Sequence, residues 1–540
     1  MPTHRAVTRP PRGPAAATVQ TDPDAIRGLL EDAAHYPGGR AAGVMFAATE
    51  ADVAVALQRA DAVLPIGAQS SLTGAATPMG ELLLATSRRT AVLGVGPDTV
   101  RVEPGLPLVT LNAQLAALGR SYPPVPTYDG ALVGGTVATN AAGAATFKYG
   151  STRGWVEALT VVLACGDVLD VARGDVHANA EGFFEVETRV RGLVRVPVPT
   201  YRMPDVPKCS AGYFAAPGMD LIDLFIGAEG TLGVITEVTL RVLPSRPKVC
   251  VTLVSFRDER PGIELAGRLR DASLRTRRTG DPAGIDVSAI EHLDRRSLQL
   301  VREDGSDRRC GVSLPADAAL ALLVQLELPP DMNAARAFDE IGRVRAPDAP
   351  DTPLVRFCRL LDEAGVLGEA EVAVPDDETR AKQLFVLREA VPAAVNARVG
   401  LAKQTVDPRI EKTAADMIVP FDRFAEMLAI YREGFERRGL DFAIWGHISD
   451  GNVHPNVIPR SLADVEAGKA AILEFGRAVA RLGGCPLAEH GVGRNPVKQS
   501  LLRDFYGAKG IAQMQAVKAA LDPGWKLAPG VIFPRPAEQR

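Results

Sequence analysis

The sequence predicts a protein of several domains that mixes α-helices with β-strands. Its 540 residues correspond to two to four structural units at about 150 residues each. Short β-rich runs alternate with helical stretches along much of the chain. Apolar residues make up 46% of the chain and charged residues 23%, which are ordinary values for a globular protein. This composition excludes a chain that is disordered throughout.

The β-rich runs are concentrated between about residues 24 and 244. We expect strands at 63–66, 82–85, 99–103, 159–164 and 168–171. Another strand is expected around residue 240, because Val238, Leu240 and Val242 alternate with Thr239 and Arg241. Pro244 and Pro247 then interrupt the chain. A domain boundary is therefore predicted near residue 245.

The second region also mixes both kinds of element. We expect strands at 249–255, 321–327 and 442–445, and loops over 330–380, which is rich in Pro, Asp and Ala. One helical face would be formed by Phe424, Leu428, Tyr431 and Phe435. Long helices are expected at about 462–482 and 496–521.

Charge, cysteine content and the N-terminal sequence limit the classes of protein. A net charge of -4 gives no composition-based case for a nucleic-acid partner. No apolar run reaches the roughly 18 residues that span a bilayer, and the 6 cysteines lie too far apart for a disulfide framework or a thiolate zinc site. Residues 1–23 lack a signal or presequence pattern and are interpreted as a disordered lead-in. We therefore expect a cytoplasmic protein, either free or peripheral to a membrane.

A segment of small and hydroxyl residues, 65–74, follows the first expected strand. Its sequence is Pro-Ile-Gly-Ala-Gln-Ser-Ser-Leu-Thr-Gly. Small residues let backbone N–H groups approach an anion, and hydroxyl groups can add hydrogen bonds to phosphate oxygens. The third glycine of a dinucleotide-binding turn and the Gly-Lys-Ser/Thr of a phosphate loop are both missing from this chain. By itself the segment is equally compatible with a surface turn.

Two further glycine-rich segments favour a bound cofactor. One runs from Val133 to Gly154, and the other from Phe225 to Thr236 as Phe-Ile-Gly-Ala-Glu-Gly-Thr-Leu-Gly-Val-Ile-Thr. Glycine at this density costs conformational entropy on folding. Three such loops in one region are easier to explain by one extended cofactor against the backbone than by three unrelated turns.

These three loops resemble the FAD-binding domain of the vanillyl-alcohol oxidase/p-cresol methylhydroxylase superfamily. The resemblance covers about residues 40–532 and implies an α+β fold. It implies a two-part FAD-binding domain of the p-cresol methylhydroxylase (PCMH) type over 24–245, and an α+β cap domain with an antiparallel sheet over 246–495. A helical C-terminal segment, 496–540, would return to the FAD domain.

The resemblance also implies which residues hold FAD. The first loop would hold the pyrophosphate, and the other two would line the adenine, ribitol and ring portions. The first loop lacks the usual Gly-Gly-Gly, but hydroxyl donors remain. Outside the lead-in, only His35 and His177 are available as histidines in this domain, and neither lies in a loop, so FAD is expected to be non-covalent. The implied FAD-binding residues are Pro65, Ile66, Gly67, Ala68, Gln69, Ser70, Ser71, Gly134, Gly135, Thr139, Asn140, Gly143, Gly150, Ser151, Arg153, Glu229, Gly230, Gly233, Val234 and Ile235.

A second group of residues carries acid–base or metal chemistry. The segment Trp445–Asn456 reads Trp-Gly-His-Ile-Ser-Asp-Gly-Asn-Val-His-Pro-Asn, and Glu489-His490-Gly491 follows downstream. Two imidazoles and a carboxylate can form an open site for a divalent cation such as Zn²⁺. The Asp-Gly-Asn turn would bring His447 and His454 together, and an extended chain after it would place His454 and Asn456 on one face. The alternative is a set of unrelated polar loop residues.

The complete pattern is similar to the D-2-hydroxyacid dehydrogenase branch, which includes D-lactate, glycolate and D-2-hydroxyglutarate dehydrogenases. That resemblance implies metal ligands at His447, His454 and Glu489, and a catalytic base at His490. The metal would lower the pKa of the substrate hydroxyl, and His490 would accept its proton while hydride passes to flavin N5.

The same resemblance implies residues that bind the substrate, a small 2-hydroxy acid. Arg388 would grip its carboxylate through a bidentate fork, and the alternative is a solvated helix arginine. Lys403, Asn456 and His490 would also contact the substrate. Pro392 stands where relatives that bind a second carboxylate have a hydroxyl residue, which disfavours 2-hydroxyglutarate.

Two other functions compete with a flavin dehydrogenase. A relative of alkylglycerone-phosphate synthase would use the same fold and FAD without net redox change, but it is disfavoured by the histidine–glutamate set. A non-catalytic FAD-binding scaffold is disfavoured by His490. The electron acceptor (quinone, cytochrome or electron-transfer flavoprotein) stays open, as does a homodimer.

Overall fold

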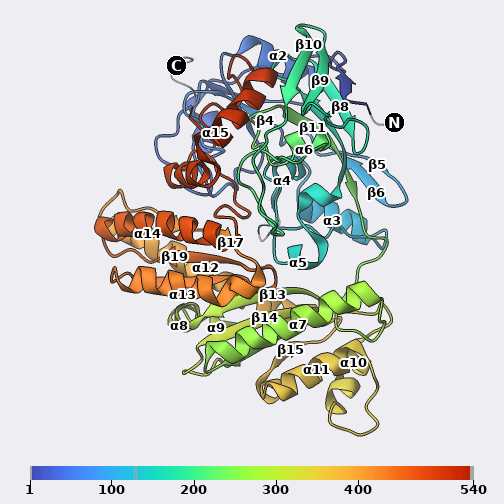
Figure 1. Cartoon of the computed structure of the whole chain (residues 1–540), viewed down its shortest axis with the longest axis vertical. Helices are drawn as coiled ribbons and strands as arrows, with labels where there is room; N and C mark the ends of the chain where they lie inside the picture. The colour runs from blue at the N-terminus through green and yellow to red at the C-terminus, as the bar shows by residue number, and fades with distance from the viewer. Residues whose placement is uncertain (1–2, 127, 129, 535–540) are drawn as a thin grey trace. The chain divides into compact units, whose positions relative to one another are not determined.

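The computed structural model describes residues 3–126, 128 and 130–534 of the chain. These residues form two compact units, and Figure 1 labels many of their elements. Unit 1 contains the chain up to residue 143, residues 150–245 and the chain from residue 486 onward. Unit 2 contains residues 144–149 and 246–485. Both units combine helices with strands, as the sequence predicts.

Unit 1 contains a small parallel sheet and a larger antiparallel one. The parallel sheet has the strand order β2 (Gly43–Phe46), β4 (Leu82–Ala85) and β3 (Val63–Ile66). The antiparallel sheet has the order β5 (Val92–Val95), β6 (Thr99–Val102), β11 (Val234–Arg241), β7 (Val156–Val162) and β8 (Val168–Ala172). The two sheets share a buried core that includes Leu57, Leu84, Val162 and Val234. The strands expected from the sequence in this region are confirmed.

A third sheet in unit 1 corrects the expectation for the N-terminus. β1 (Arg5–Val7) pairs in parallel with β9 (Phe183–Thr188), which pairs with β10 (Gly192–Pro197). Arg9 binds the carboxylates of Glu50 and Asp170. The expected disorder of residues 1–23 is therefore wrong for the described residues 3–23, because partners far along the chain order them.

The helices of unit 1 lie mostly in its connections. Thr49 and Asp52 begin α2 with a reciprocal capping box. The final helix begins at Pro496 with Asn495 as its N-cap. The α-helices are α1 (Pro23–Arg27), α2 (Glu50–Arg59), α3 (Leu108–Ala116), α4 (Val133–Ala138), α6 (Ile222–Phe225) and α15 (Pro496–Leu521).

Unit 2 is built on one antiparallel sheet. Its strand order is β15 (Glu371–Ala373), β12 (Lys248–Phe256), β14 (Leu320–Leu328), β13 (Val287–Asp294), β18 (Phe442–His447), β19 (Asn452–Val457) and β16 (Thr413–Ala414). A short strand, β17 (Met417–Ile418), also pairs with β19. The expected antiparallel sheet and the expected strands near 249–255, 321–327 and 442–445 are confirmed.

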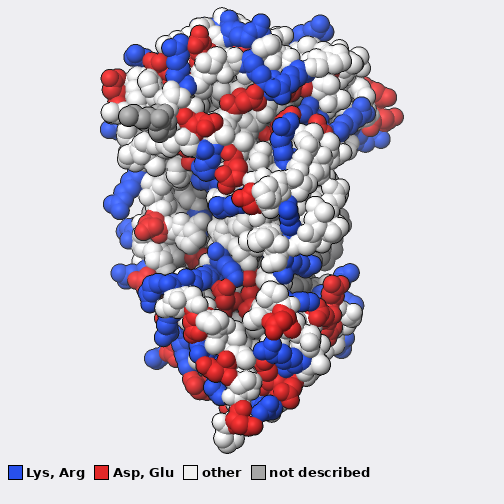
Figure 2. Space-filling view, turned by 90° about the vertical axis from the view of Figure 1, so that its right-hand side faces the viewer, with Lys and Arg blue, Asp and Glu red and all other residues white. Residues whose placement is uncertain are grey.

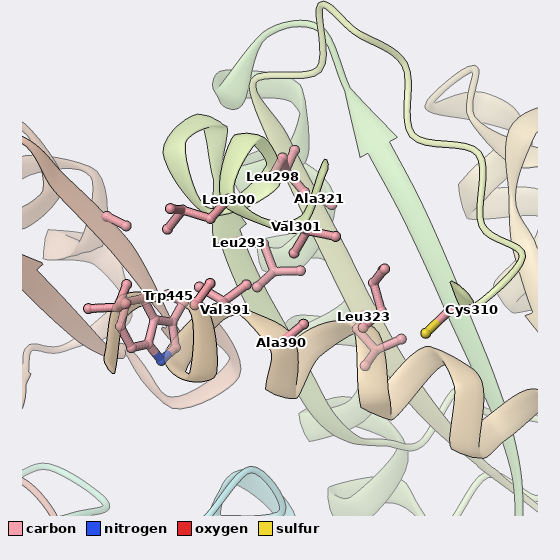
Figure 3. Packing of buried hydrophobic residues seen from close by; sticks show 14 of the residues in the cluster. Leu293, Leu298, Leu300, Val301, Cys310, Ala321, Leu323, Ala390, Val391 and Trp445 are labelled. Atoms are coloured by element: carbon pink, nitrogen blue, oxygen red, sulfur yellow. The ribbon is translucent and has the colours of Figure 1, made fainter. Parts of the chain in front are cut away.

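Helices cover this sheet and form part of its core. Figure 3 shows α8 and α12 side chains around Leu293 and Leu323 of the sheet, with Trp445 beside them. The expected loop region 330–380 is wrong in part, because it contains α10 and α11. The α-helices of unit 2 are α5 (Thr146–Tyr149), α7 (Glu259–Thr279), α8 (Arg295–Glu303), α9 (Ser306–Arg309), α10 (Ala334–Gly342), α11 (Pro353–Glu363), α12 (Glu378–Thr405), α13 (Phe424–Glu436) and α14 (Leu462–Arg481).

Charged side chains of both signs are interspersed on the face shown in Figure 2. This distribution agrees with the small net charge of -4. Among the described residues, no helix combines the length and apolar character needed to cross a membrane.

The N-cap of α8 leads to a prediction about pH and stability. Asp294 accepts hydrogen bonds from the amide and hydroxyl of Ser297 at 2.8 and 2.6 Å. Burial raises the pKa of Asp294 to about 6, although these hydrogen bonds oppose the rise. The folded state therefore holds this proton more tightly than the unfolded chain, where the pKa is about 3.9. The stability that results is present below about pH 4 and is lost as the pH rises towards 6.

Asp294→Asn keeps a capping side chain but removes this titration. We expect the unfolding free energy of the variant, relative to wild type, to increase by about 3 kcal/mol between pH 4 and pH 7. Urea unfolding at several pH values measures this change. A difference that stays constant with pH would show that Asp294 does not titrate in this range.

Candidate active site

Three neighbouring strands of unit 2 place polar side chains on one face of the sheet. Glu291 on β13 lies directly opposite His447 on β18, and Trp445 on β18 lies opposite His454 on β19. Directly opposed residues of antiparallel strands share a face. The rings of His447 and His454 are 5.6 Å apart between centroids and nearly perpendicular, at 87°. The structure thus brings together the two histidines that the sequence singles out.

The connection between β18 and β19 explains why this hairpin forms. Residues 448–450 make one turn of 3-10 helix, and Gly451 follows with a φ of 86°. A Cβ atom at Gly451 would also lie 2.2 Å from the carbonyl oxygen of Val419. Both the backbone conformation and the close approach require glycine here. The turn expected at Asp-Gly-Asn is confirmed.

Each of the two histidines has a carboxylate beside its Nδ1 atom. Glu291 Oε1 lies 2.7 Å from His447 Nδ1, and Asp416 Oδ1 lies 3.5 Å from His454 Nδ1. Asn452 also donates to Asp416, at 3.1 Å. A carboxylate at Nδ1 is the usual outer partner of a histidine that binds a metal through Nε2. The donor set in unit 2 therefore fits a divalent cation.

Arg388 lies on the same face of the sheet, on helix α12. Its Nε donates to Glu291 Oε2 at 3.0 Å, and its Nη1 donates to Glu389 at 2.9 Å. Only 6% of its side chain is exposed, so the alternative of a solvated surface arginine is wrong. Burial raises the pKa of Glu291, but the charges of Arg388 and His447 outweigh it and lower the pKa to about 2. Glu291 is consequently anionic at neutral pH.

Two other predicted substrate-binding residues, Asn456 and Lys403, lie in different environments. Asn456 is buried on β19, two residues beyond His454, and its side-chain amide donates to the His454 carbonyl oxygen at 2.9 Å. Lys403 is exposed in the last turn of α12. Because α12 is one helix through Pro392, the rise of about 1.5 Å per residue separates Lys403 from Arg388 by about 22 Å. The structure does not bring Lys403 together with Arg388.

Glu489 and His490 belong to unit 1, although we expect the cap domain to extend to residue 495. The Glu489 carboxylate lies 3.2 Å from Nζ of Lys208, whose side chain is completely buried. His490 Nε2 lies 3.7 Å from the other Glu489 oxygen. Lys208, Glu291 and Asp416 are functional candidates that motif reasoning misses. Glu291 lies in β13, a strand that is not among those expected from the sequence, so no local signal marks it.

The segment after His490 is attached to two of the glycine-rich loops. Both oxygens of Glu229 accept backbone N–H groups, from Val492 and from Gly493, each at 2.8 Å. The Thr73 carbonyl oxygen accepts from Arg494 N–H at 3.0 Å. Burial raises the pKa of Glu229 to about 7, although the two N–H donors act in the opposite direction. Glu229, a predicted FAD-binding residue, thus supports the segment that carries Glu489 and His490.

The first glycine-rich loop has the donors that a phosphate group requires. Within the described part of the chain, the amide N–H groups of residues 68–72 donate to no protein acceptor. Gln69 has a left-handed backbone, with a φ of 51°, at a position where a glycine would be usual. Its side chain donates to the carbonyl oxygens of Leu29 and Ala76, at 2.9 and 2.8 Å, and holds this conformation. These amides fit the pyrophosphate of FAD.

The glycines of the other two loops have two different explanations. A Cβ atom at Gly134, Gly143 or Gly233 would come within 2.5 Å of another part of unit 1. These three glycines are therefore required by packing within the protein, and they are not explained by a cofactor. A Cβ atom at Gly135 or Gly150 would have nothing within 4 Å, so these two positions leave space beside the backbone.

The same two loops are also tied to each other. Gly227 and Glu229 donate backbone hydrogen bonds to residues 137 and 138, at 2.9 and 2.7 Å. The Arg153 guanidinium donates to Asp223 and to the Ile226 carbonyl oxygen. Asn140 and Glu229 have left-handed backbones with φ of 49° and 50°. Such conformations cost about 1–3 kcal/mol and are concentrated at functional sites.

Comparison with known proteins gives the class that this fold and these loops define. Residues 41–172 match the family described as the FAD binding domain, and residues 269–532 match the C-terminal domain of FAD linked oxidases. The protein is therefore a flavoprotein with a PCMH-type FAD-binding domain. Over the second of these ranges the chain is similar to the FAD-linked oxidases.

Curated relatives resemble the chain over most of its length. It is 27% identical to the glycolate oxidase subunit GlcD of Bacillus subtilis, over 88% of this chain and 85% of that protein. It is 26% identical to D-lactate dehydrogenase of Anaerostipes hadrus, over 87% and 84%. It is 29% identical to D-2-hydroxyglutarate dehydrogenase of Xanthomonas citri pv. viticola, over 88% and 84%.

Solved structures support the fold. A 4-ethylphenol oxidase from Gulosibacter chungangensis superimposes with a TM-score of 0.62 at 16% identity, over 97% of this chain and 95% of that chain. An alkyldihydroxyacetonephosphate synthase superimposes with a TM-score of 0.56 at 14% identity, over 90% and 76%. At these identities the likeness concerns the fold alone.

Proposed function

We propose that the protein is an FAD-dependent dehydrogenase that oxidises a D-2-hydroxy acid to the 2-oxo acid. The observation that carries this proposal is the face of the unit 2 sheet on which His447 and His454 each lie beside a buried carboxylate, with Arg388 buried next to them. The relatives named for glycolate, D-lactate and D-2-hydroxyglutarate support the same substrate class.

Each candidate residue has a chemical role in this proposal. Arg388 would bind the substrate carboxylate, because its planar fork matches two carboxylate oxygens. His447, His454 and Glu489 would hold a divalent cation, with Zn²⁺ as the first candidate. His490 would accept the hydroxyl proton, and Asn456 would contact the substrate. Bound FAD would supply the hydride acceptor, and the cation a Lewis acid.

The substrate is expected to carry one carboxylate, as D-lactate does. Pro392 occupies the position one helical turn after Arg388, where a hydroxyl side chain would assist a second carboxylate. Proline has no such donor. This residue disfavours D-2-hydroxyglutarate, although one relative carries that name.

A non-redox synthase is the competing function from another reaction class. One solved structure of this fold is an alkyldihydroxyacetonephosphate synthase, but the likeness does not extend beyond the fold. The carboxylate-paired histidines favour the dehydrogenase, because a divalent cation lowers the pKa of a hydroxyl group that must lose its proton.

Anaerobic reduction of the flavin tests the proposed function. We expect purified protein to be yellow, and acid denaturation to release intact FAD into solution. D-2-hydroxy acids, but not their L enantiomers, should then bleach the oxidised flavin in the native protein. Treatment with a chelator should slow the bleaching, and added Zn²⁺ should restore it. A flavin that no hydroxy acid bleaches would favour the synthase or the scaffold instead.

A further inference from the structure

Glu291 connects two residues that have separate roles in the proposed function. One carboxylate oxygen lies 2.7 Å from Nδ1 of His447, which is its direct cross-strand partner. The other oxygen accepts a hydrogen bond from Nε of Arg388 on helix α12, at 3.0 Å. The side chains of these three residues are 2–6% exposed. Each oxygen of Glu291 therefore has its own buried donor.

The contact with His447 determines which ring nitrogen can bind a cation. A carboxylate that accepts from Nδ1 holds the proton on that atom, so that Nε2 presents the lone pair. Glu291 and His447 face each other because of the register between β13 and β18. The sheet thus holds the imidazole in one orientation and one tautomer.

The contact with Arg388 restrains the guanidinium plane. Arginine has five N–H donors in a rigid planar group. Two of them donate to carboxylates: Nε donates to Glu291, and Nη1 donates to Glu389. Because the guanidinium group is planar, these two hydrogen bonds also determine the plane in which its other N–H donors lie. A substrate carboxylate would meet a fork that is already oriented, which lowers the entropy lost on binding.

We propose that Glu291 is a positioning residue that orients His447 for the cation and Arg388 for the substrate carboxylate at the same time. This inference rests on the proposed function. A purely structural ion pair is the alternative, and it would affect folding alone. A positioning role makes a different prediction, because losing the carboxylate should weaken cation binding and substrate binding together while the fold persists.

Glu291→Gln, a change that preserves shape, separates the two interpretations. The amide would place an NH2 group against a donor, either His447 Nδ1 or Arg388 Nε. Losing such an outer partner typically weakens metal binding by about 10–100-fold, and we expect this effect on the Zn²⁺ dissociation constant measured by chelator competition. With saturating Zn²⁺, KM for the best hydroxy acid should rise about tenfold or more, with a smaller change in kcat. FAD content should match wild type.

Glu340→Gln is the matched control in unit 2. Glu340 is also a buried carboxylate with two side-chain donors, Arg336 Nε at 2.9 Å and Thr352 Oγ1 at 2.6 Å, but it lies on α10. This variant should keep the wild-type Zn²⁺ affinity and KM. Glu291→Asp keeps the negative charge and should recover part of both losses; it also serves as the test variant if Glu291→Gln does not fold.

The outcomes distinguish this inference from the proposed function. Weaker Zn²⁺ binding and a higher KM in Glu291→Gln, absent from Glu340→Gln, would support the positioning role. Wild-type Zn²⁺ affinity in both Glu291 variants would overturn the inference and leave the proposed function standing. Wild-type protein that binds no Zn²⁺ and is not reduced by hydroxy acids would overturn both.

Discussion

Replacing His490 by alanine is expected to slow reduction of the flavin by a 2-hydroxy acid about 10²-fold or more, the usual scale for losing a general base. The His490 side chain is 28% exposed, so it is accessible to a small molecule. The segment that follows it is held by backbone hydrogen bonds to Glu229 and Thr73, which do not involve the imidazole. FAD content should therefore stay normal. Anaerobic stopped-flow absorbance measures the rate.

The control for this variant is His4→Ala. His4 is a histidine of unit 1 with a side chain that is 46% exposed, and it lies far along the chain from the candidate site. In the His4→Ala variant, the hydroxy acid should reduce the flavin at the wild-type rate. An unchanged rate in His490→Ala would show that His490 is not the base. Loss of FAD from that variant would show instead that the imidazole supports the cofactor-binding loops.

Replacing Lys518 by methionine is expected to cost about 3–5 kcal/mol of unfolding free energy, the usual effect of breaking a buried ion pair from one side. Lys518 lies on α15 with 2% of its side chain exposed. Its ammonium group donates to the Asp522 carboxylate at 2.5 Å and to the carbonyl oxygens of Thr231 and Leu527 at 2.6 and 2.8 Å. Methionine would leave these three buried acceptors without the charge that they surround.

The same substitution should lower FAD content, because Thr231 belongs to a glycine-rich loop. Urea unfolding and the ratio of flavin to protein absorbance measure the two effects. Lys509→Met is the control, since Lys509 is exposed on the same helix, and it should stay within about 0.5 kcal/mol of wild type. Equal unfolding free energies of the two variants would show that the Lys518 contacts make no net contribution to stability.

Elements with a local signal are predictable from the sequence. β3 and β4 have the expected bounds, because short apolar runs between turn residues read as strands. On α13, Phe424, Leu428, Tyr431 and Phe435 are all buried, as their helical spacing predicts. The α10–α11 region is missed because its high content of Pro, Asp and Ala is typical of loops. Proline at the first position of a helix, after the N-cap Thr352, instead helps to start it.

Elements that depend on distant partners are not predictable in this way. β1 is a strand because it pairs with β9, about 180 residues later. The return to unit 1 at residue 486, before Glu489 and His490, likewise has no local marker. Lys403 is separated from Arg388 because α12 continues through Pro392, whereas the sequence alone suggests that both could reach one substrate.

The sequence by itself determines the three glycine-rich loops and the hairpin that brings His447 and His454 together. Turn residues and left-handed positions act within a few residues, so their effect can be read from the chain. Only the tertiary structure places Glu291 against His447, 156 positions away, and against Arg388, 97 positions away. Strand register and helix packing decide these contacts, and both depend on burying apolar surface between segments that are distant in the chain. The ion pair of Lys208 with Glu489 arises in the same way, because such a buried charge is stable only where the fold supplies its partner.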